Sequence, residues 1–541
     1  MSPIRVDRLA HHLAVIGYPK DKTEYLIQGF THGFFLGDPF DSEASDIAAN
    51  NSKMASDHPE VVEMKLEQEI NAGRISGPHT SPPFSPFQIS PLNVREKSTP
   101  GKYRLIHDLS YPYNDESINS KIPDHLKSVK YSSVRDTMAT LSRLPKGVYM
   151  AKCDIADAYR IIPLHPSEYP KLGMMWKGQY YFDKYLPQGC GSSCRIFEAF
   201  STALEAIFKF YNPVGDVQHM IDDFLFIALT FKKCDALLKA FTQLCDDIGV
   251  PLAPHKTTVP DVVVIFLGIL LNSLMRTASL PGEKTESYVK DIEVYLNRRK
   301  VTQKELQSIV GKLNFAAAVV PARPFLFRLI QKIYSVHKPH HKIWLTCEMK
   351  EDLKTWLQFL REYNGVTLFR ALKLTPSHAI NLGSDASLKG LGACFENQWI
   401  QAAYSGDWIG LPIHVLELYP LLILINMFGE KLRNKSVLFL CDNRAVVDII
   451  KSQSSACPRT MKIMRPLTLN LIKFNIYLTS EHIPGKQNVL PDLISRFKVT
   501  KQILQSFKMR LNPTPIPWSL LPENFDIGSG KTCQQPGKRT H

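Results

Sequence analysis

The stretch MIDDFLF, Met220 to Phe226, decides the fold of this chain. It places two adjacent carboxylates, Asp222 and Asp223, between apolar residues that are typical of the two buried strands of a hairpin, so the acids are predicted at a tight turn. Such a turn is either a solvated loop, because Asp is common in turns, or a site that holds metal ions. One hairpin cannot bind two hard cations alone, so the second interpretation requires another carboxylate at the end of a second buried strand. Asp154 is that carboxylate.

The composition describes a basic chain that can form several packed cores. With 541 residues, 44% of them hydrophobic and 10% aromatic, the sequence predicts three or four packed units and excludes a disordered chain. The formal charge of +14 favours a polyanionic partner, although an ordinary basic protein can carry the same excess. Ten cysteines without a CxxC pair indicate reduced thiols in an intracellular protein of the cytoplasm or nucleus, and no structural zinc.

No segment is predicted to cross a membrane. The longest apolar run, Val262 to Leu271, is too short for a bilayer. The first residues, MSPIRVDRLAHHL, lack the apolar core of a signal peptide. We therefore expect a soluble protein without a membrane partner.

The first part of the chain carries no recognisable chemistry. Residues 1–58 are predicted as an N-terminal extension with a short helix near Val6 to Ile16 and a polar connector at 41–56. From Pro59 a helical pattern leads to the segment HTSPPFSPF, whose prolines force an extended chain.

A basic hairpin is predicted at residues 90–110, SPLNVREKSTPGKYRLIHDLS. Two strands flank a Pro-Gly turn, and Lys97, Lys102 and Arg104 lie within eight residues of one another. Such a hairpin can close over a triphosphate. A surface hairpin with solvated charges is an equally good interpretation of this segment alone.

The segment GVYMAKCDIADAYRIIPL predicts a buried strand that ends at Asp154, followed by a helical turn with Asp157 and Tyr159. A Pro-Gln-Gly turn then opens a long amphipathic helix. A second helix, Cys234 to Gly249, leads to an apolar strand ending in FLGIL. Helices that alternate with an antiparallel core predict an α+β fold.

Seven elements follow one another along the chain in this order: Lys97, Arg104, Asp154, LPQG at 186–189, IDD at 221–223, Lys256 and FLG at 266–268. This series resembles the motif series of the reverse transcriptases of retroelements. The segments RLIHDLSYP, YYFDKYLPQGCGSSCRIFE and HMIDDFLFI are similar in style to DIRS-type retrotransposons. Met220 departs from the family, which has an aromatic residue before the acid pair near the primer end; a flexible Met is expected to be tolerated there.

The resemblance implies a right-hand polymerase of fingers, palm and thumb that extends a DNA primer on an RNA template with dNTPs. It also implies two Mg²⁺ ions, with Mn²⁺ as a possible substitute, about 4 Å apart. Asp154 and Asp222 would bridge both ions, and Asp223 would support them. Clustered carboxylates without a cation raise one another's pKa values, so a fold that gathers them implies a cation partner.

The same resemblance assigns residues to the substrate. Lys97 and Arg104 would clamp the triphosphate, since Arg can bind two oxygens at once. Lys256 would protonate the leaving group, and Gln188 of LPQG would contact the substrate. The ring of Tyr159 would lie beneath the incoming sugar and exclude a 2'-hydroxyl; a buried core aromatic is the alternative.

Residues 282–375 are predicted to form the thumb and a connection. Thr302 and Glu305 form a capping box that opens the helix VTQKELQSIVGKLNFAAAVV, which has one apolar stripe. An ordinary bundle helix would have the same stripe, so its position after FLGIL favours the thumb. The segment HKPHHK, residues 337–342, is interpreted as solvated rather than metal-binding.

A second series of acids follows. Asp385 comes after a predicted strand, and Glu417 opens a strongly apolar helix with Pro420 in its first turn. Asp442 ends the strand SVLFLCD and begins a helix, and Asp492 opens a short helix. Each acid alone is better explained as a cap or a turn residue.

Together, these four acids in a β-β-β-α-β-α unit at 376–497 resemble the ribonuclease H domain. The resemblance implies an α/β domain whose four carboxylates hold two metal ions that activate water against the RNA strand of an RNA–DNA hybrid. His482 and Asn488 lie in the loop before Asp492, where this family often has a mobile His that aids product release.

The predicted organisation is an N-terminal extension at 1–58, fingers and palm at 59–281, thumb and connection at 282–375, a ribonuclease H-like domain at 376–497, and a disordered tail at 498–541. No Asp-Thr-Gly or Asp-Ser-Gly protease signature and no His-His-Cys-Cys integrase pattern occurs. DIRS-type elements use a tyrosine recombinase, which the 44 residues after Phe497 are too few to encode, so a separate recombinase is expected.

The sequence therefore predicts an RNA-directed DNA polymerase fused to a ribonuclease H. The alternative is a decayed element that persists only as a nucleic-acid-binding protein. Carboxylates at all seven predicted metal positions argue against decay, since drift has no reason to spare them selectively.

Overall fold

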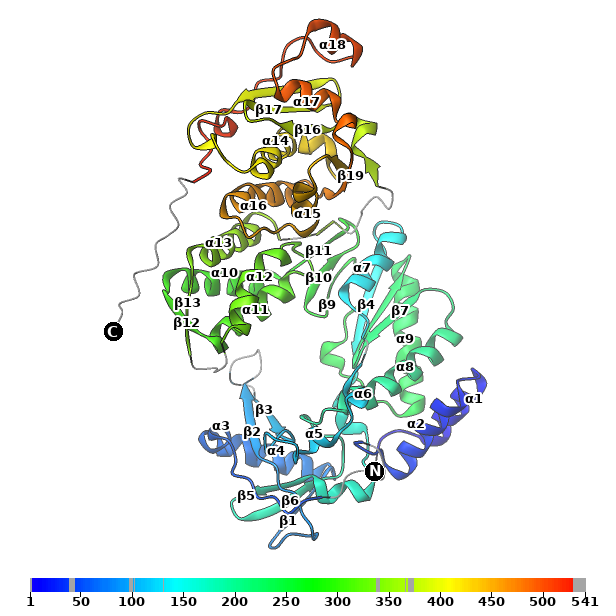
Figure 1. Cartoon of the computed structure of the whole chain (residues 1–541). Helices are drawn as coiled ribbons and strands as arrows, with labels where there is room; N and C mark the ends of the chain where they lie inside the picture. The colour runs from blue at the N-terminus through cyan, green and yellow to red at the C-terminus, as the bar shows by residue number, and fades with distance from the viewer. Residues whose placement is uncertain are drawn as a thin grey trace, which may run out of the picture. The chain divides into compact units, whose positions relative to one another are not determined.

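The computed structural model describes residues 2–37, 44–96, 101, 103–129, 131–336, 341–364, 366–367 and 374–528 (Figure 1). The chain divides into two compact units, one of residues 1–137 with 145–267 and one of 138–144 with 268–541. The expectation of three or four units is therefore wrong. The reason is that the N-terminal helices share a core with the palm, and the thumb helices belong to the same unit as the C-terminal domain.

Helices α1 (Val6–Val15) and α2 (Lys20–His32) belong to the core of the first unit. Their apolar residues Leu9, Leu13 and Phe30 are buried in the same cluster as the palm strands. The predicted helix near 6–16 is confirmed, but the segment before residue 58 is not independent of the palm. This N-terminal segment contributes buried residues to the core of the palm.

The fingers combine short strands with small helices. Strands β2 and β3 pair antiparallel with Val94 opposite Leu105, as the hairpin interpretation predicts. Residues 97–100 and 102 of this hairpin, including Lys97 and Lys102, lie outside the described residues. The elements of this part are α3 (Lys53–Asp57), α4 (Pro59–Asn71), β1 (Ile75–His79), β2 (Leu92–Glu96), β3 (Tyr103–His107), α5 (Ile118–Lys121), α6 (Asp124–Lys127), β5 (Gly173–Trp176) and β6 (Gln179–Asp183). Helix α7 (Val134–Arg143) begins in the first unit, and its residues from 138 onward belong to the second.

The palm sheet has the order β4-β8-β7 and is antiparallel throughout. Helix α9 packs on β4 and β8, and α8 packs on β7. The rings of Phe224 and Phe226 on β8 meet the ring of Phe241 on α9, with centroids 4.7 and 5.1 Å apart. The elements are β4 (Tyr149–Asp154), α8 (Ser193–Tyr211), β7 (Asp216–Met220), β8 (Asp223–Ala228) and α9 (Phe231–Ile248).

The apolar run at 262–271 is two strands rather than the end of one. Strand β9 (Val263–Phe266) and strand β10 (Ile269–Asn272) are separated by Leu267 and Gly268, with φ values of +49° and +75°. Two consecutive left-handed residues form the tight turn that hairpins favour. The Gly of FLG therefore supplies a turn and not a strand position. Strand β11 (Thr277–Ser279) pairs with β10 and with β14 (Val366–Thr367).

The thumb region is helical, as predicted. The capping box is confirmed: Glu305 N donates to Thr302 Oγ1 at 3.2 Å, and Thr302 N donates to Glu305 Oε2 at 2.7 Å. Leu306, Ile309 and Leu313 are buried, so the apolar stripe faces the core. The elements are α10 (Gly282–Asn297), β12 (Lys300–Thr302), α11 (Gln303–Ala316), α12 (Phe327–Tyr334), β13 (Lys342–Trp344) and α13 (Cys347–Glu362). Of the segment HKPHHK, residues 337–340 lie outside the described residues.

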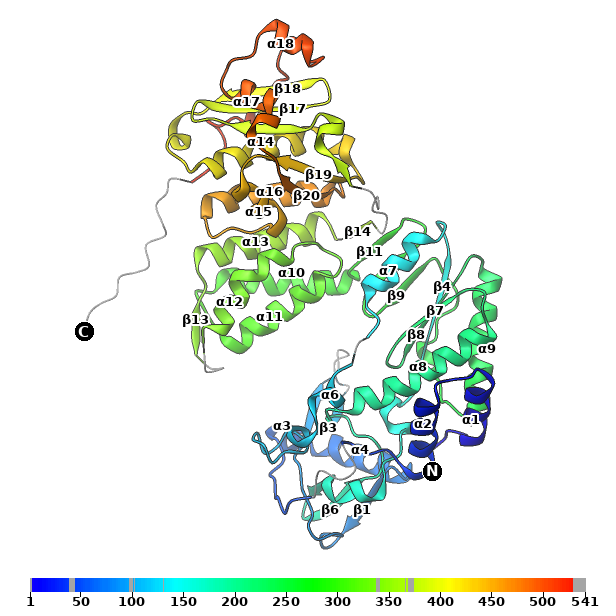
Figure 2. The same ribbon diagram turned by 45° about the vertical axis from the view of Figure 1, so that its right-hand side comes forward.

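The C-terminal domain begins with the predicted β-β-β-α-β-α order, from β16 to α15, but α16 and β20 then precede the helix that carries Asp492, and the prediction did not include them. Antiparallel strands β16, β17 and β18 lie against helix α14 on one side and α17 on the other (Figure 2). Parallel strands β19 and β20 continue the domain, and α16 packs on α14. The elements are β15 (Thr375–Pro376), β16 (Gly383–Ala386), β17 (Gly390–Phe395), β18 (Gln398–Ala403), α14 (Ile413–Phe428), β19 (Ser436–Cys441), α15 (Arg444–Ser452), α16 (Pro458–Lys473), β20 (Tyr477–His482) and α17 (Val489–Ser495).

Helix α14 begins at Ile413, so Pro420 is in its interior and not in its first turn as predicted. A proline there leaves the carbonyl of Leu416 without its usual helical donor. The hydroxyl of Tyr404 donates to that carbonyl at 2.8 Å, which explains why the proline is tolerated. The stretch Ile413–Leu432 is long and apolar enough to cross a membrane, but 67% of the tested window is buried within the domain.

The tail after Phe497 is not disordered up to residue 528, contrary to the prediction. It forms helix α18 (Lys501–Ser506) and then packs on the domain. Trp408 Nε1 donates to the carbonyl of Pro522 at 2.7 Å, and the hydroxyl of Tyr419 donates to that of Leu520 at 2.8 Å. The prediction from composition was wrong because the residues that order this segment are buried aromatics about 100 positions earlier in the chain. Residues 529–541 lie outside the described residues.

A buried ion-pair network joins the thumb helices to the C-terminal domain within the second unit. Asp352 on α13 is fully buried and accepts hydrogen bonds from Arg465 on α16 at 2.8 Å and from Arg328 on α12 at 3.0 Å. Removing one partner of such a network would leave an uncompensated buried charge. The expected boundary near residue 375 is therefore crossed by a structural contact.

Candidate functional site

The palm brings three predicted carboxylates to one end of its sheet. Asp154 ends β4 and lies directly opposite Asp223, the first residue of β8. Asp222 occupies the turn between β7 and β8, where its carbonyl accepts a hydrogen bond from Ile155 N at 3.0 Å. The metal-site interpretation of MIDDFLF requires this juxtaposition, and a solvated loop does not.

The turn before Asp222 is strained and held from α8. Ile221 has a φ of +57°, which a β-branched residue rarely adopts. Its N–H donates to Glu198 Oε2 at 3.2 Å, and its carbonyl accepts from Ser201 Oγ at 2.7 Å. These two α8 residues, which the sequence did not single out, fix the turn that presents Asp222.

The palm carboxylates are partly buried and repel one another. Burial, with the charges of Asp154 and Asp223, raises the pKa of Asp222 to about 6. Burial and the charge of Asp154 also raise the pKa of Asp223. Lys256 is one counter-ion of this group: its Nζ lies 2.7 and 2.9 Å from the two oxygens of Asp154. This set of oxygen donors fits a hard divalent cation, which would relieve the repulsion.

A cavity of about 390 Å³ opens onto these acids. Asp154 and Asp222 line it together with Arg104, Gln188 and Lys256, so five predicted site residues meet in one place. Gln188 Oε1 is buried without a hydrogen-bond partner within the described part of the chain. The predicted role of Lys97 falls outside the described residues.

Tyr159 belongs partly to the core. Its ring meets Phe197 edge to face, with centroids 5.7 Å apart, and its hydroxyl is hydrogen-bonded to Cys194 Sγ at 3.1 Å. Burial raises the pKa of Tyr159, and the charge of Asp222 adds to the shift. The ring therefore makes the contacts of a core residue, and the charge of Asp222 acts on its hydroxyl.

An ion network supports the turn that carries Tyr159. Arg160 donates to Asp183 Oδ1 at 2.8 Å and to Glu69 Oε2 at 2.9 Å. Asp157, which precedes the 3-10 turn Ala158–Ile161, has a left-handed φ of +54°. An arginine between apolar residues was the signal in the sequence that could have indicated this network.

The second centre begins with Asp385, which lies within β16 opposite Gly392 of β17. A Cβ at Gly392 would lie 2.3 Å from Ser495 N, so only glycine lets α17 approach this closely. Ser495 Oγ donates to Asp385 Oδ2 at 2.5 Å. Burial, with the charges of Asp442 and Asp492, raises the pKa of Asp385 to about 6 against the effect of the Ser495 hydrogen bond.

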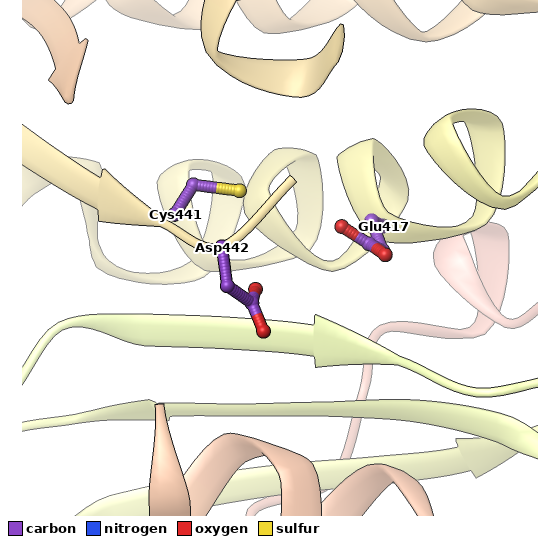
Figure 3. A group of neighbouring side chains, drawn as sticks. All are labelled: Glu417, Cys441 and Asp442. Carbon is purple, nitrogen blue, oxygen red and sulfur yellow. The ribbon is translucent and has the colours of Figure 1, made fainter. Parts of the chain in front are cut away.

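Glu417 and Asp442 converge with Cys441, which the sequence did not single out. One ligand atom of each lies within 4.8 Å of the others (Figure 3). Burial, with the charges of Asp385 and Asp442, raises the pKa of Glu417 to about 7. The side chain of Asn443 opposes this shift by hydrogen bonding to Glu417, while its Oδ1 caps α15.

Of the two predicted polar residues, Asn488 lies in the loop before α17, whereas His482 is the last residue of β20 and not a loop residue. Asn488 is buried, and its Nδ2 donates to Asp442 Oδ1 at 3.2 Å. His482 is exposed at the end of β20, opposite Cys441 in register. Asp492 lies in the first turn of α17 rather than opening it, and pairs with Arg496 at 2.7 Å. Its charge also raises the pKa of Asp385.

Comparison with known families and proteins agrees with this architecture. Residues 94–271 match the family model described as reverse transcriptase (RNA-dependent DNA polymerase). The chain is 22% identical over 288 residues to the Gag-Pol polyprotein of Koala retrovirus, which covers 52% of this chain and 16% of that protein. It is 21% identical over 419 residues to the genome polyprotein of Petunia vein clearing virus, covering 75% and 17%. The chain thus spans less than a fifth of these relatives.

Among solved structures, a foamy viral protease-reverse transcriptase in complex with double-stranded DNA superposes with a TM-score of 0.50 at 14% identity. The match covers 88% of this chain and 81% of the other. The predicted α+β fold is confirmed, with a region that matches the reverse transcriptase model followed by a mixed α/β domain.

Proposed function

We propose, from the reverse transcriptase domain at residues 94–271, that this chain is an RNA-directed DNA polymerase with ribonuclease H activity. It would copy retroelement RNA into DNA and degrade the RNA strand of the resulting hybrid. The observation that carries the proposal is the opposition of Asp154 and Asp223 across β4 and β8, with Asp222 at the adjoining turn.

In the palm, Asp154, Asp222 and Asp223 would hold the two Mg²⁺ ions, or Mn²⁺ in their place. The ions supply activation of the primer 3'-hydroxyl and stabilisation of the leaving pyrophosphate. Arg104, which lines the same cavity, would bind phosphate oxygens in bidentate fashion. The ammonium of Lys256 would donate a proton to the pyrophosphate oxygen.

The phosphate and sugar contacts complete the proposed polymerase site. Lys97 would join Arg104 on the triphosphate. Gln188, whose Oε1 is unpartnered in the cavity region, would accept a hydrogen bond from the substrate. Tyr159 would exclude the 2'-hydroxyl of a ribonucleotide.

In the C-terminal domain, the proposed metal ligands are Asp385, Glu417, Asp442 and Asp492. Metal bound there supplies an activated water for cleavage of the RNA phosphodiester. Asn488 and Ser495 orient Asp442 and Asp385 by hydrogen bonds. Exposed His482 would aid product release.

The proposed partners are an RNA template, a DNA primer, dNTPs and an RNA–DNA hybrid, consistent with the net charge of +14. We assign the chain to a DIRS-type element that works with a separate tyrosine recombinase, and place it inside the cell, in the cytoplasm or nucleus. The motifs RLIHDLSYP and HMIDDFLFI support this subclass.

Extension of a DNA primer on an RNA template, with and without Mg²⁺, tests the proposal. We expect extension that stops when Mg²⁺ is chelated and is absent in Asp222→Asn. Template binding by gel shift is measured in parallel, because Asp222→Asn removes a metal ligand and no basic residue. A folded wild-type chain that binds template but never extends the primer would support the decayed, binding-only alternative.

A further inference from the structure

Cys441 adds a sulfur to the carboxylates of the C-terminal centre. It is the last residue of β19, is 3% exposed, and immediately precedes Asp442. Its Sγ lies within 4.8 Å of ligand oxygens of both Glu417 and Asp442. Figure 3 shows Cys441 and Asp442 next to each other at the end of the strand, and Glu417 on the neighbouring helix.

The three donors come from ordered elements. Asn443 N donates to Cys441 Sγ at 3.5 Å, and the Asn443 side chain is hydrogen-bonded to Glu417. Asn488 holds Asp442 from the opposite loop at 3.2 Å. The sulfur and both carboxylates are therefore fixed near one another before any ion binds, which reduces the cost of ordering them.

A sulfur donor changes which ions such a set prefers. Mg²⁺ is a hard cation that takes oxygen ligands and leaves a thiol uncoordinated. Zn²⁺ and ions of its class bind thiolate together with carboxylate, commonly in four-coordinate sites. Glu417 and Asp442 serve both kinds of ion, whereas Cys441 serves only the second.

We propose that Cys441, Glu417 and Asp442 bind a thiophilic divalent cation of the zinc class, which displaces Mg²⁺ from the two carboxylates and stops hybrid cleavage. The regulatory part of this inference rests on the proposed ribonuclease H function. Binding replaces the Sγ–H bond by a sulfur–metal bond, and the proton passes to water. No electron transfer is involved.

A buried cysteine is otherwise an ordinary small apolar residue, and the chain offers a matched control. Cys394 on β17 is also buried in this domain, at 2% exposure, and its Sγ contacts Asn381 Oδ1 at 3.9 Å. It belongs to no cluster of ligand atoms within the described ranges of the chain. Cys441→Ser and Cys394→Ser therefore remove comparable thiols with different predicted consequences.

Cobalt titration of the full chain tests the site, with Co²⁺ as a spectroscopic probe for Zn²⁺. We expect a sulfur-to-cobalt charge-transfer band in the wild type that disappears in Cys441→Ser and persists in Cys394→Ser. In Glu417→Gln the midpoint of the titration should weaken more than about tenfold, because one ligand is lost. A band unchanged in Cys441→Ser, or lost equally in Cys394→Ser, overturns the proposal.

Two further measurements can contradict the metal site or its regulatory role. If Cys441→Ser fails to fold by circular dichroism, the Glu417→Gln titration decides, since that variant retains the thiol: an unchanged midpoint overturns the site. Zn²⁺ inhibition is then measured against each variant's own Mg²⁺-driven hybrid cleavage. Equal inhibition of wild type and folded Cys441→Ser overturns the regulation. A Cys441-dependent band in a chain that never cleaves hybrid supports the metal site while rejecting the proposed ribonuclease H function.

Discussion

The phenolic oxygen of Tyr159 lies 3.1 Å from the sulfur of Cys194, so the ring is fixed to helix α8 through its hydroxyl. Its edge is fixed as well, by the ring of Phe197 in the palm core. A ring held at two points cannot move aside. Such a ring is suited to exclude a substrate by contact, and it is a core residue for the same reason.

Replacing Tyr159 by Val should therefore relax sugar selection. We expect ribonucleotide incorporation to rise by about one to two orders of magnitude relative to dNTP incorporation, equivalent to roughly 1.4 to 3 kcal/mol of lost discrimination. Single-nucleotide incorporation with matched dNTP and rNTP measures the effect, and a melting curve checks folding.

Tyr159→Phe and Cys194→Ala separate the ring from its anchor. Phe keeps the ring and loses the hydroxyl, so most of the discrimination should persist in both variants. If Tyr159→Val loses activity with both substrates in parallel and melts earlier, Tyr159 is a core residue alone. An unchanged dNTP preference would remove it from the site.

The two carboxylate centres belong to different compact units, so their activities should be separable. Asp222→Asn is expected to abolish DNA synthesis and leave hybrid-directed RNA cleavage, because only the palm ligand set changes. Asp442→Asn should have the opposite effect. Both activities are measured on one purified chain for each variant. A single substitution that silences both in a folded protein would contradict the assignment of two independent centres.

Local signals predicted well where the structure is decided locally. The Asp222 turn, the strand ending at Asp154 and the capping box of Thr302 and Glu305 all depend on residues within one hairpin or one helical turn. The spacing of apolar and polar residues is therefore sufficient to predict these three features.

Predictions failed where distant residues decide. Pro420 indicated a first turn, but the helix begins seven residues earlier because Tyr404 satisfies the carbonyl that the proline leaves free. The polar tail looked disordered, but its carbonyls pair with buried Trp408 and Tyr419. In both cases a hydroxyl or an indole N–H from another element of the fold donates to a backbone carbonyl that would otherwise have no donor. Rules that consider only neighbouring residues cannot predict such a contact.

The site residues divide in the same way. The seven predicted carboxylates could be identified by type and order. The residues that orient them could not: Ser495, Asn443 and Glu198 are ordinary polar residues until the fold places them beside Asp385, Glu417 and the Ile221 turn. Gly392 was the nearest signal, since a glycine within an apolar strand indicates a close approach.

His219 should make the β7–β8 hairpin sensitive to alkaline pH. It is buried on β7, lies 3.3 Å from Glu198, and is hydrogen-bonded to Glu205, whose other partner is Lys209. Burial lowers the pKa of His219, but the two glutamates overcome this and raise it from 6.5 to about 9. Its contribution is thus fully present below pH 6.5 and is lost as the pH rises through 9, on the order of 3 kcal/mol.

Hydrogen–deuterium exchange of residues 216–228 measures this effect locally. The wild-type hairpin should lose protection between pH 6.5 and 9.5, after correction for intrinsic exchange. In His219→Gln, which keeps a polar side chain but cannot be charged, protection should be lower at pH 6.5 and independent of pH over this range. A wild-type profile as flat as that of the variant would show that His219 is not charged in the fold.

Ser495→Ala should weaken the second centre alone. The hydroxyl orients Asp385 at 2.5 Å, and loss of such a supporting hydrogen bond typically costs about 10- to 100-fold in metal affinity or activity. Hybrid cleavage is measured as a function of Mg²⁺ concentration, with primer extension as the internal control. Ser506→Ala, at the exposed end of α18, is the matched variant and should be silent. Equal cleavage by both variants would exclude an orienting role for Ser495.

Truncation after Lys508 should destabilise the C-terminal domain. It removes the carbonyl of Leu520 that pairs with Tyr419 and that of Pro522 that pairs with Trp408. Each buried donor left unpaired costs about 1 to 3 kcal/mol, and the lost burial of Ile527 adds to this. We expect a lower melting temperature, and a red-shifted tryptophan emission as Trp408 becomes exposed. Truncation after Gly528 preserves all these contacts and is the control, so a shift of similar size in both truncations would show that residues 509–528 do not stabilise the domain.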